Sequence, residues 1–418
     1  MLPPPPAYPP RTVQTPGVGG VHRASPEDFV VQELPLRPPA GQGDHLWLLV
    51  RKRNLSTTAA AGLLARALGV RPRDVRYAGM KDRVAVATQA FTVRVGDRDV
   101  VPPRSLCNRS VRVLEWSRTD RGLKRGELAG NRFTLLLRRV KPDALRIARD
   151  ALDQLTAHGA PHAFGCQRFG ARNLNHHIGA ALARGRWRQA LDLLLGCANA
   201  QGFRDLPARM AYEKGDLAEA IALTPPGDSP ERRALEALRR NNDPHSALLA
   251  LSSTQLRFYL SALQSAVFNA LLTRRVKQNT WRRPLPGDIA APVATLRDAS
   301  SDAATQQDVC PTGPLWGPDM PRAHGEPGMW EAHALDEAGL SLSDLTSLRD
   351  VVQVGPLGAR RPLRMTVHDA SVEHVDTEDG PALRCCFTLP PGAFATIVLR
   401  EIMGEAAVDS PAITAPRD

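Results

Sequence analysis

Two kinds of hydrophobic pattern alternate along the first 160 residues of the chain. Apolar residues at every second position, or in short runs, predict β-strands, whereas recurrence every three or four positions predicts helices. The segments that fit strands are residues 29–31, 45–50, 75–78, 88–95, 111–116 and 133–140, and those that fit helices are 55–68 and 143–157. Strands that cluster with helices between them indicate an α+β fold.

The pattern changes after about residue 160. Helical spacing dominates in three segments, 180–195, 231–240 and 253–276, and Leu256, Leu260, Leu263, Val267 and Leu271 form one apolar stripe on the last of them. Residues 298–328 are dense in Gly, Pro, Ser and Asp and are predicted to be loops. Strand patterns return at 363–367 and 383–389, and a helical pattern follows at 394–403.

These changes predict a middle block inserted into an α+β domain that is made from both ends of the chain. A length of 418 residues suits two or three domains. Residues 1–20, rich in Pro and Gly, are predicted to be disordered, and residues 406–418 to be a flexible tail. The α+β domain is then expected to comprise residues 21–158 and 333–405, with the insertion at 159–332.

The charge balance points towards a polyanionic partner. Lys and Arg total 54 against 43 Asp and Glu, a formal net charge of +11. An excess of this size favours nucleic acid, because neutralising phosphates releases condensed counterions. Arginine richness that merely follows genome composition, together with the many Ala, Gly and Pro residues, is an equal alternative.

The cysteines and the N-terminus exclude several classes of protein. Six cysteines without CxxC spacing argue against a disulfide framework and a zinc site, and the adjacent His176 and His177 lack ligand partners at metal spacing. We therefore expect no metal. The N-terminus has no charged n-region followed by an apolar h-region, and no apolar run reaches membrane-spanning length, so we expect a cytoplasmic protein without membrane contact.

Five segments combine polar residues with glycines or aromatics at the boundaries of the predicted elements. They are RASPEDFVVQE (23–33), YAGMKDRVAVATQ (77–89), GNRFTLLLR (130–138), FGCQRFG (164–170) and LPPGAFATIVLRE (389–401). In this order and at this spacing the segments resemble the tRNA pseudouridine synthase D (TruD) family. The resemblance extends from about residue 23 to about residue 403, nearly the whole chain.

The resemblance implies a fold and an activity. The fold would be a pseudouridine synthase-type catalytic domain with a mixed, mainly antiparallel sheet, interrupted by the family's own α/β insertion domain. The activity would be isomerisation of a uridine in tRNA, in the family usually uridine 13, to pseudouridine. It would need no cofactor and no metal, and the protein would be a monomer whose partner is tRNA.

Asp82 is the catalytic carboxylate that the resemblance implies. Pseudouridine formation breaks a C1′–N1 bond and joins C5 to the same sugar carbon, so a carboxylate could act as a nucleophile at C1′ or a base at C2′. A dry pocket disfavours a charged carboxylate unless a cation opposes this, and Arg23, at a position where family members carry lysine, could hold Asp82 bidentately. From the residues alone, a structural turn aspartate is the alternative.

The remaining site residues follow from the same resemblance. Phe133 is the candidate for stacking on a flipped-out base, Asn131 for a hydrogen bond to uracil or to the catalytic loop, and Phe29 and Phe394 for the pocket wall. For each phenylalanine the alternative is core packing. Lys81 is interpreted first as a phosphate contact or a structural ion pair and second as the partner of Asp82; a solvated lysine is equally compatible.

Basic residues spread over both expected domains could bind RNA in the cleft between them, or could form a dispersed solvated surface. They are Arg51, Lys52, Arg53, Arg71, Arg73, Arg121, Lys124, Arg125, Arg274, Arg275, Lys277, Arg282 and Arg283. The FGCQRFG segment could brace the active-site loop or contact the RNA backbone. Two further hypotheses stay open: the same chemistry on another RNA class, and an RNA-binding protein without catalysis.

Overall fold

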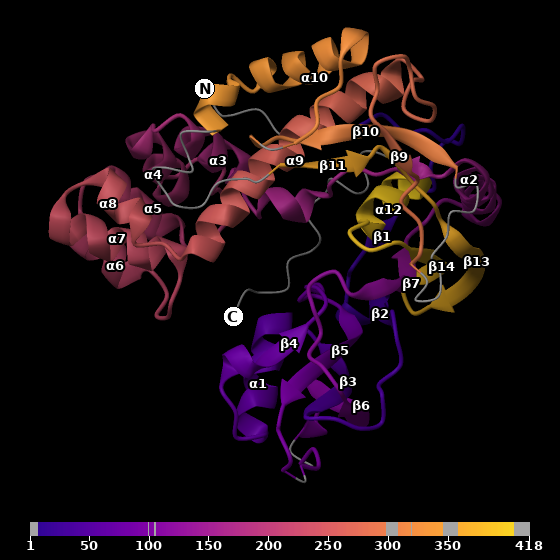
Figure 1. Cartoon of the computed structure of the whole chain (residues 1–418), viewed down its shortest axis with the longest axis horizontal. Helices are drawn as coiled ribbons and strands as arrows, with labels where there is room; N and C mark the ends of the chain where they lie inside the picture. Colours follow the sequence, from indigo (N-terminus) through magenta and orange to yellow (C-terminus); the bar gives the residue numbers. More distant parts are fainter. Residues whose placement is uncertain are drawn as a thin grey trace.

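The computed structural model describes residues 7–98, 100–103, 106–297, 308–318, 320–345 and 358–404. Residues 1–6 and the tail predicted at 406–418 lie outside this range. The chain forms a sheet lobe and a helical lobe, which Figure 1 shows side by side. No helix among the described residues combines the length and apolarity needed to cross a bilayer.

A nine-stranded sheet forms the centre of the sheet lobe. Its main path runs β13 (His368–Thr377), β14 (Gly380–Leu389), β7 (Leu128–Arg138), β2 (Phe29–Pro35), β5 (Val86–Arg94), β3 (His45–Arg53) and β6 (Val111–Thr119). The short strands β1 (Val21–His22) and β4 (Val75–Tyr77) pair with β7 and β5. Only β2 and β5 run parallel among the described pairs, so the expectation of a mixed, mainly antiparallel sheet is confirmed.

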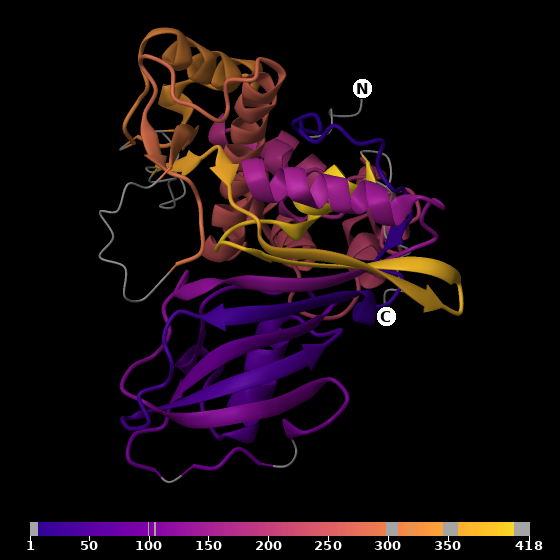
Figure 2. The ribbon, with the colours of Figure 1, turned by 90° about the vertical axis from the view of Figure 1, so that its right-hand side faces the viewer.

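Helices cover the two halves of the sheet and complete two separate cores. Helix α2 (Ala144–His158) lies across β13 and β14, as Figure 2 shows, and packs against α12 (Ala395–Met403). Helix α1 (Thr57–Ala67) covers β3, β5 and β6, and its first turn is capped by the Ser56 hydroxyl, which accepts a hydrogen bond from the Ala59 amide at 3.1 Å.

Eight helices of the helical lobe lie wholly within the described residues. They are α3 (Asn175–Ala183), α4 (Trp187–Leu195), α5 (Leu206–Glu213), α6 (Leu217–Leu223), α7 (Pro230–Asn241), α8 (Pro244–Leu249), α9 (Ser253–Lys277) and α10 (Gly325–Glu337). The single helix expected at 180–195 is therefore two helices, separated at Gly185, whose φ is +64°. Helix α9 joins the lobes, because Leu260 is buried in the helical core and Phe268 in the sheet-lobe core.

The helical lobe extends beyond the boundary expected at residue 332. Helix α10 spans that position, and β10 (Val309–Leu315) pairs with β9 (Ala290–Pro292) and β11 (Ala359–Pro362) in a three-stranded sheet. Part of the segment expected as loops is thus regular structure. The strand signal is masked because β10 contains Pro311, Gly313 and Pro314, and a Cβ at residue 313 would lie 2.9 Å from the Phe268 ring.

The N-terminal segment from residue 7 to 20 is packed on the sheet lobe, contrary to the disorder expected from its composition. Val13 and Val18 are buried in the sheet-lobe core. The Glu401 carboxylate accepts hydrogen bonds from the amides of Thr12 and Val13, at 2.7 and 3.1 Å. Composition favours disorder here because it does not reveal these partners, which come from the opposite end of the chain.

Candidate active site

The loop that carries Asp82 joins β4 to β5. Tyr77 pairs with Phe91 at the end of β4, and β5 begins at Val86, so the intervening residues project from one edge of the sheet. β5 is parallel to β2 and begins beside its start, with Val86 opposite Val30. This register places the loop next to Phe29 and the preceding Arg23.

Buried polar side chains hold the backbone of this loop. The Lys81 amide donates to the Thr57 hydroxyl at 2.9 Å, and that hydroxyl donates to the Gln89 side-chain oxygen at 2.9 Å. The Gln89 amide group in turn donates to the Gly79 carbonyl at 3.2 Å. Thr57 and Gln89 are buried, so the chain of bonds is shielded from water and orders the loop.

Lys52 is a third side chain that anchors the loop, and the sequence did not indicate its place in the site. Its side chain is fully buried, and its Nζ donates to the backbone carbonyls of Asp82 at 2.6 Å, Leu55 at 2.7 Å and Lys81 at 3.4 Å. Burial lowers the pKa of Lys52 to about 8, although the Asp82 carboxylate opposes the shift. Lys52 is therefore unavailable as a surface contact for RNA.

Lys81 does not pair with Asp82. Its Nζ lies 2.6 Å from the Glu33 carboxylate, and the two side chains are 6% and 1% exposed. The other Glu33 oxygen accepts the Ala90 amide at 3.1 Å, so this buried carboxylate has a partner on each side. Of the interpretations offered for Lys81, the geometry agrees with a structural ion pair.

Arg23 is the partner of the Asp82 carboxylate. Arg23 Nη2 lies 2.6 Å from Asp82 Oδ2, a single contact rather than the bidentate one expected. The Arg23 guanidinium also lies over the Phe29 ring, 3.8 Å from its centroid, and its backbone has a φ of 60°, which is unfavourable for a residue with a side chain. Among the described residues no other group donates to the carboxylate, so Asp82 Oδ1 is unpaired.

A cavity of about 360 Å³ opens beside this ion pair. All seven residues that the sequence analysis proposed for the site line it: Arg23, Phe29, Lys81, Asp82, Asn131, Phe133 and Phe394. Phe29 and Phe133, 2% and 7% exposed, form its floor with their rings 6.0 Å apart and nearly perpendicular. Phe394 is half-buried and forms a wall. The volume falls within the range of small-ligand sites.

Asn131 brings an unsatisfied polar atom to the cavity. It lies on β7, opposite Glu33 of β2 and Leu389 of β14, which places it between the Asp82 loop and the segment that leads to Phe394. Its Oδ1 is buried and accepts no hydrogen bond from any described residue. Buried side-chain oxygens are seldom left unpaired, so this oxygen is available to a ligand donor.

The wall that carries Phe394 is braced from the helical lobe. The Phe164 and Phe394 rings are 5.8 Å apart, and a Cβ at Gly165 would lie 2.5 Å from the Thr396 hydroxyl, so only glycine permits this approach. Both backbone polar groups of Phe164 bond to the Asn269 side chain on α9, at 2.9 and 3.0 Å. Bracing is thus the interpretation of the FGCQRFG segment that the contacts favour.

Arg361 of β11, a partly buried residue, ties the same wall to the helical lobe. Its guanidinium donates to the carbonyls of His162 and Gly392, both at 3.0 Å, and lies 4.2 Å from the Phe164 ring centroid. Burial lowers the pKa of Arg361 to about 9. The loop before Phe394 is therefore positioned by contacts from both lobes.

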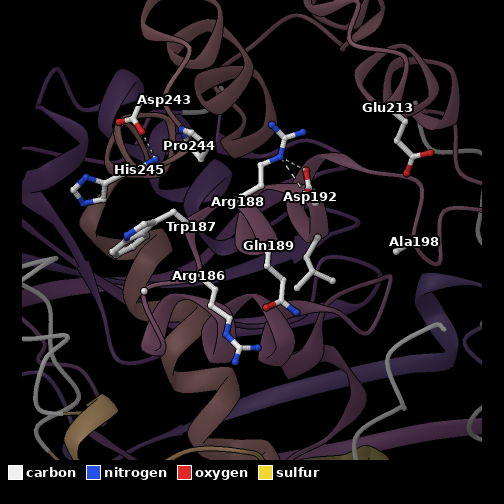
Figure 3. A pocket seen from close by; sticks show the side chains of 12 residues that line it. Arg186, Trp187, Arg188, Gln189, Asp192, Ala198, Glu213, Asp243, Pro244 and His245 are labelled. Carbon is white, nitrogen blue, oxygen red and sulfur yellow. Dashed lines mark hydrogen bonds and ion pairs between the residues drawn. The ribbon is translucent and has the colours of Figure 1, made fainter.

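A larger cavity, of about 940 Å³, lies within the helical lobe and is shown in Figure 3. Its three carboxylates have partners: Asp192 pairs with Arg188, Asp243 caps α8, and Glu213 accepts a hydrogen bond from the Cys197 amide. The Trp187 and His245 rings are in contact, with their centroids 4.5 Å apart. None of the seven proposed site residues lines it, and it holds no unpaired carboxylate beside an apolar floor.

Within the part of the chain that the structure describes, no three His, Cys, Asp or Glu side chains are grouped closely enough to hold a metal ion. The six cysteines are free thiols. The groups that line the cavity are instead an ion pair, an amide oxygen and phenylalanine rings, a set suited to a planar polar ligand.

Comparisons with known proteins identify relatives of the chain. Residues 9–402 match the profile of the family described as tRNA pseudouridine synthase D (TruD). The tRNA pseudouridine synthase D of Geobacter sulfurreducens is 37% identical over 409 residues, covering 94% of this chain and 96% of the relative. That of Chromohalobacter salexigens is 33% identical over 412 residues, covering 95% and 97%.

A solved structure gives the same result for the fold. The crystal structure of a Methanosarcina mazei protein described as tRNA pseudouridine synthase D (TruD) superposes with a TM-score of 0.72 at 25% sequence identity. It covers 95% of this chain, and this chain covers 96% of it. The sequence matches and the shared fold together show that the chain belongs to the tRNA pseudouridine synthase D (TruD) family of isomerases.

Proposed function

We propose that this protein converts a uridine of tRNA, at position 13, to pseudouridine, with Asp82 as the catalytic carboxylate. The observation that carries the proposal is the Asp82–Arg23 ion pair at the edge of an apolar cavity that also contains an unpaired amide oxygen. Pseudouridine formation needs one charged carboxylate at the sugar and a pocket that retains the uracil while it turns.

Asp82 acts at the ribose. Its Oδ2 is held by Arg23, and Oδ1 is free to approach C1′ as a nucleophile or the C2′ proton as a base. The C1′–N1 bond then breaks, the uracil turns, C5 bonds to C1′, and the C5 proton is lost to solvent while N1 regains one. The guanidinium would remain beside the carboxylate as its counter-ion after the nucleotide has displaced water from the cavity.

The cavity suits a base that has been flipped out of the RNA. Phe133 and Phe29 offer an apolar floor, and the half-buried Phe394 offers a ring for stacking. Asn131 Oδ1 can accept the N3–H group of uracil, a donor that is present before and after the turn. Lys81, through its ion pair with Glu33, supports the loop rather than the base.

The substrate would bind where the two lobes meet. Gln167 from the helical lobe lines the cavity together with the sheet-lobe residues, which supports a tRNA bound at the junction of a catalytic domain and an insertion domain. We propose a monomer as the working unit. We place the protein in the cytoplasm with its substrate.

The Asp82→Asn variant tests the proposal. Transcribed tRNA labelled with tritium at uracil C5 releases the label when C5 bonds to C1′, and sequencing locates the modified position. We expect release to fall by several orders of magnitude in the variant while tRNA binding persists. Asp74→Asn is the control, because Asp74 pairs only with the exposed Arg71. Normal turnover by Asp82→Asn would refute the role of Asp82.

The substrate assignment has its own test. Tritium release is compared among transcripts of tRNA, ribosomal RNA and messenger RNA with the wild-type protein. We expect release from tRNA, and loss of release when uridine 13 is replaced by cytidine. Release confined to another RNA class would overturn the tRNA assignment, and no release from any transcript would indicate a binding protein.

A further inference from the structure

A third cavity, of about 560 Å³, lies on the sheet lobe among the loop before β4, the strand itself and the loop that precedes β7. Its lining includes four cationic side chains, Arg73, Arg76, Lys124 and Arg125, together with Tyr77. No Asp or Glu is among the lining residues. We call this set the four-cation groove.

The four cations have no counter-ion of their own. All four side chains are exposed, and none forms an ion pair with any residue in the described ranges. The nearest carboxylates in the sequence are already engaged: Asp74 pairs with Arg71, and Glu127 pairs with Arg121. Like charges gathered on one wall repel one another, and a bound polyanion would relieve that repulsion.

The groove is held to the catalytic cavity by a direct backbone contact. Tyr77 lines the groove, and the next residue, Ala78, lines the catalytic cavity. Likewise, Arg125 lines the groove and the next residue, Gly126, lines the catalytic cavity. The Gly126 amide donates to the Ala78 carbonyl at 2.7 Å, which joins the two walls. An RNA strand that leaves the catalytic cavity on this side therefore meets these cations within one or two nucleotides.

The side chains are supported in ways that suit a phosphate backbone. The Arg76 stem passes close over Gly122, where a Cβ would lie 2.9 Å from Arg76 Cδ, and this contact limits its freedom. Tyr77 packs its ring edge-on against Phe91 at 5.9 Å and gives the groove a fixed aromatic floor. Cations interleaved with an aromatic ring are typical of sites for single-stranded nucleic acid.

We propose that the four-cation groove binds the backbone phosphates of the RNA strand next to the flipped-out uridine. The inference rests on the proposed function, since it assigns the groove to the same substrate. Binding there would fix the direction in which the strand crosses the Asp82 loop. The phosphates carry no base identity, so the groove would contribute affinity and register rather than sequence preference.

The test is a quadruple variant, Arg73→Ala, Arg76→Ala, Lys124→Ala and Arg125→Ala. Its matched control is Arg149→Ala, Arg239→Ala, Arg240→Ala and Arg257→Ala, exposed arginines outside both cavities that also have no ion pair among the described residues. Both variants lower the net charge by four. Circular dichroism and thermal melting establish that each is folded before its binding to transcribed tRNA is measured.

We expect the groove variant to bind tRNA about 100-fold more weakly at 0.1 M salt, and its log–log salt slope to fall by about 0.7 for each lost contact. The control should lose much less, and kcat at saturating tRNA should change little in either. Replacing the three groove arginines by lysine should restore most of the affinity, because phosphate contacts need charge more than shape.

Equal weakening in the two quadruple variants would overturn the inference, since the effect would then be one of net charge. It would also be overturned if the groove variant lost binding of a free nucleoside triphosphate but kept normal tRNA affinity. Failure of the proposed function is distinguishable, because it would appear as an absence of pseudouridine with the wild-type protein, whatever the binding results.

Discussion

Three cations surround the Asp82 loop, and each has a different partner. Arg23 binds the Asp82 carboxylate, Lys52 binds its backbone carbonyl, and Lys81 binds the buried Glu33. Arg23 therefore neutralises the carboxylate, whereas Lys52 and Lys81 hold the loop that carries it. Only the contact with Arg23 would be altered directly by a bound nucleotide.

Lys52 gives a prediction for the dependence of activity on pH. Because its pKa is lowered to about 8, the ammonium loses its proton as pH rises through that value, and its hold on the Asp82 carbonyl weakens. Wild-type kcat should therefore fall above pH 8. Lys52→Met should be about 100-fold less active at pH 7, since small misplacement of a reacting group costs this much, and its kcat should show no fall near pH 8.

The stability of the folded protein should rise with pH while kcat falls, so the fall in kcat cannot be explained by unfolding. The unfolded state binds the Lys52 proton up to its ordinary pKa of about 10.5, so between pH 8 and 10.5 the unfolded state binds more protons. The melting temperature of the wild type should thus rise relative to Lys52→Met across that window. Identical activity profiles for the two proteins would contradict the role assigned to Lys52.

Motif order predicted seven of the residues that line the cavity beside Asp82, but it gave no indication that Lys52 anchors the Asp82 loop. A signal was nevertheless present, because Lys52 is in phase with Leu46, Leu48 and Val50 along β3, and all four are buried. Its neighbours Arg51 and Arg53 are exposed and suggested a solvated basic run. The single Arg23–Asp82 contact could not be predicted either, because it depends on the unusual backbone of Arg23.

Helix α9 connects the interior of one lobe to the active site of the other. Its apolar stripe was readable from the sequence, whereas the role of Asn269 was not, since one amide on an apolar helix gives no indication of its partner. In the structure that amide satisfies both backbone groups of Phe164, whose ring contacts Phe394. The helix thus positions a cavity wall that belongs to another element.

Asn269→Leu is predicted to disturb both stability and catalysis. The substitution leaves the Phe164 amide and carbonyl buried without partners, at about 1–3 kcal/mol each, which lowers the melting temperature by several degrees. The wall at Phe394 should also shift, with a fall of about 100-fold in kcat/KM for tRNA. Differential scanning calorimetry and tritium release at a temperature well below the transition measure the two effects.

Thr273→Val provides the control for this substitution. Thr273 lies on the same helix, and among the described residues its hydroxyl donates only to the backbone carbonyl of Asn269. Loss of this hydroxyl should therefore leave the wall in place. Normal kcat/KM in a destabilised Asn269→Leu protein would show that the helix does not position Phe394.

The whole molecule carries a net charge of +11. Some of its cationic side chains are exposed and can contact RNA, whereas others are buried and cannot. Lys52 and Arg275, both expected as surface contacts, are buried, and Arg275 pairs with Asp288 at 2.7 Å. The exposed cations still favour a polyanion. We therefore expect the KM for tRNA to rise at least tenfold between 50 and 200 mM monovalent salt, with kcat nearly constant.

The measurement is a series of initial rates at fixed pH, with Asp82→Asn used to follow binding alone. Its dissociation constant should have the same salt slope as the wild-type KM. A KM independent of salt would show that phosphate contacts do not dominate binding, and the charge excess would then reflect composition.

The division of the molecule into lobes was predictable in outline because the hydrophobic period changes near residue 160. The second boundary was not predictable, for two reasons. The prolines and glycine of β10, Pro311, Gly313 and Pro314, conceal the strand pattern. In addition, α10 packs with α9 although 47 residues separate Lys277 from Gly325. The buried contacts place the return to the sheet lobe near β11, which ends at Pro362. We propose this as the domain boundary.

The cavity beside Asp82 draws its lining from residues as far apart in the sequence as Arg23 and Thr396. A ribosome making this protein would therefore have to release almost the entire polypeptide before any nucleotide could be accommodated. Incomplete translation products would lack the Phe394 wall and could not modify the very tRNAs that take part in their synthesis.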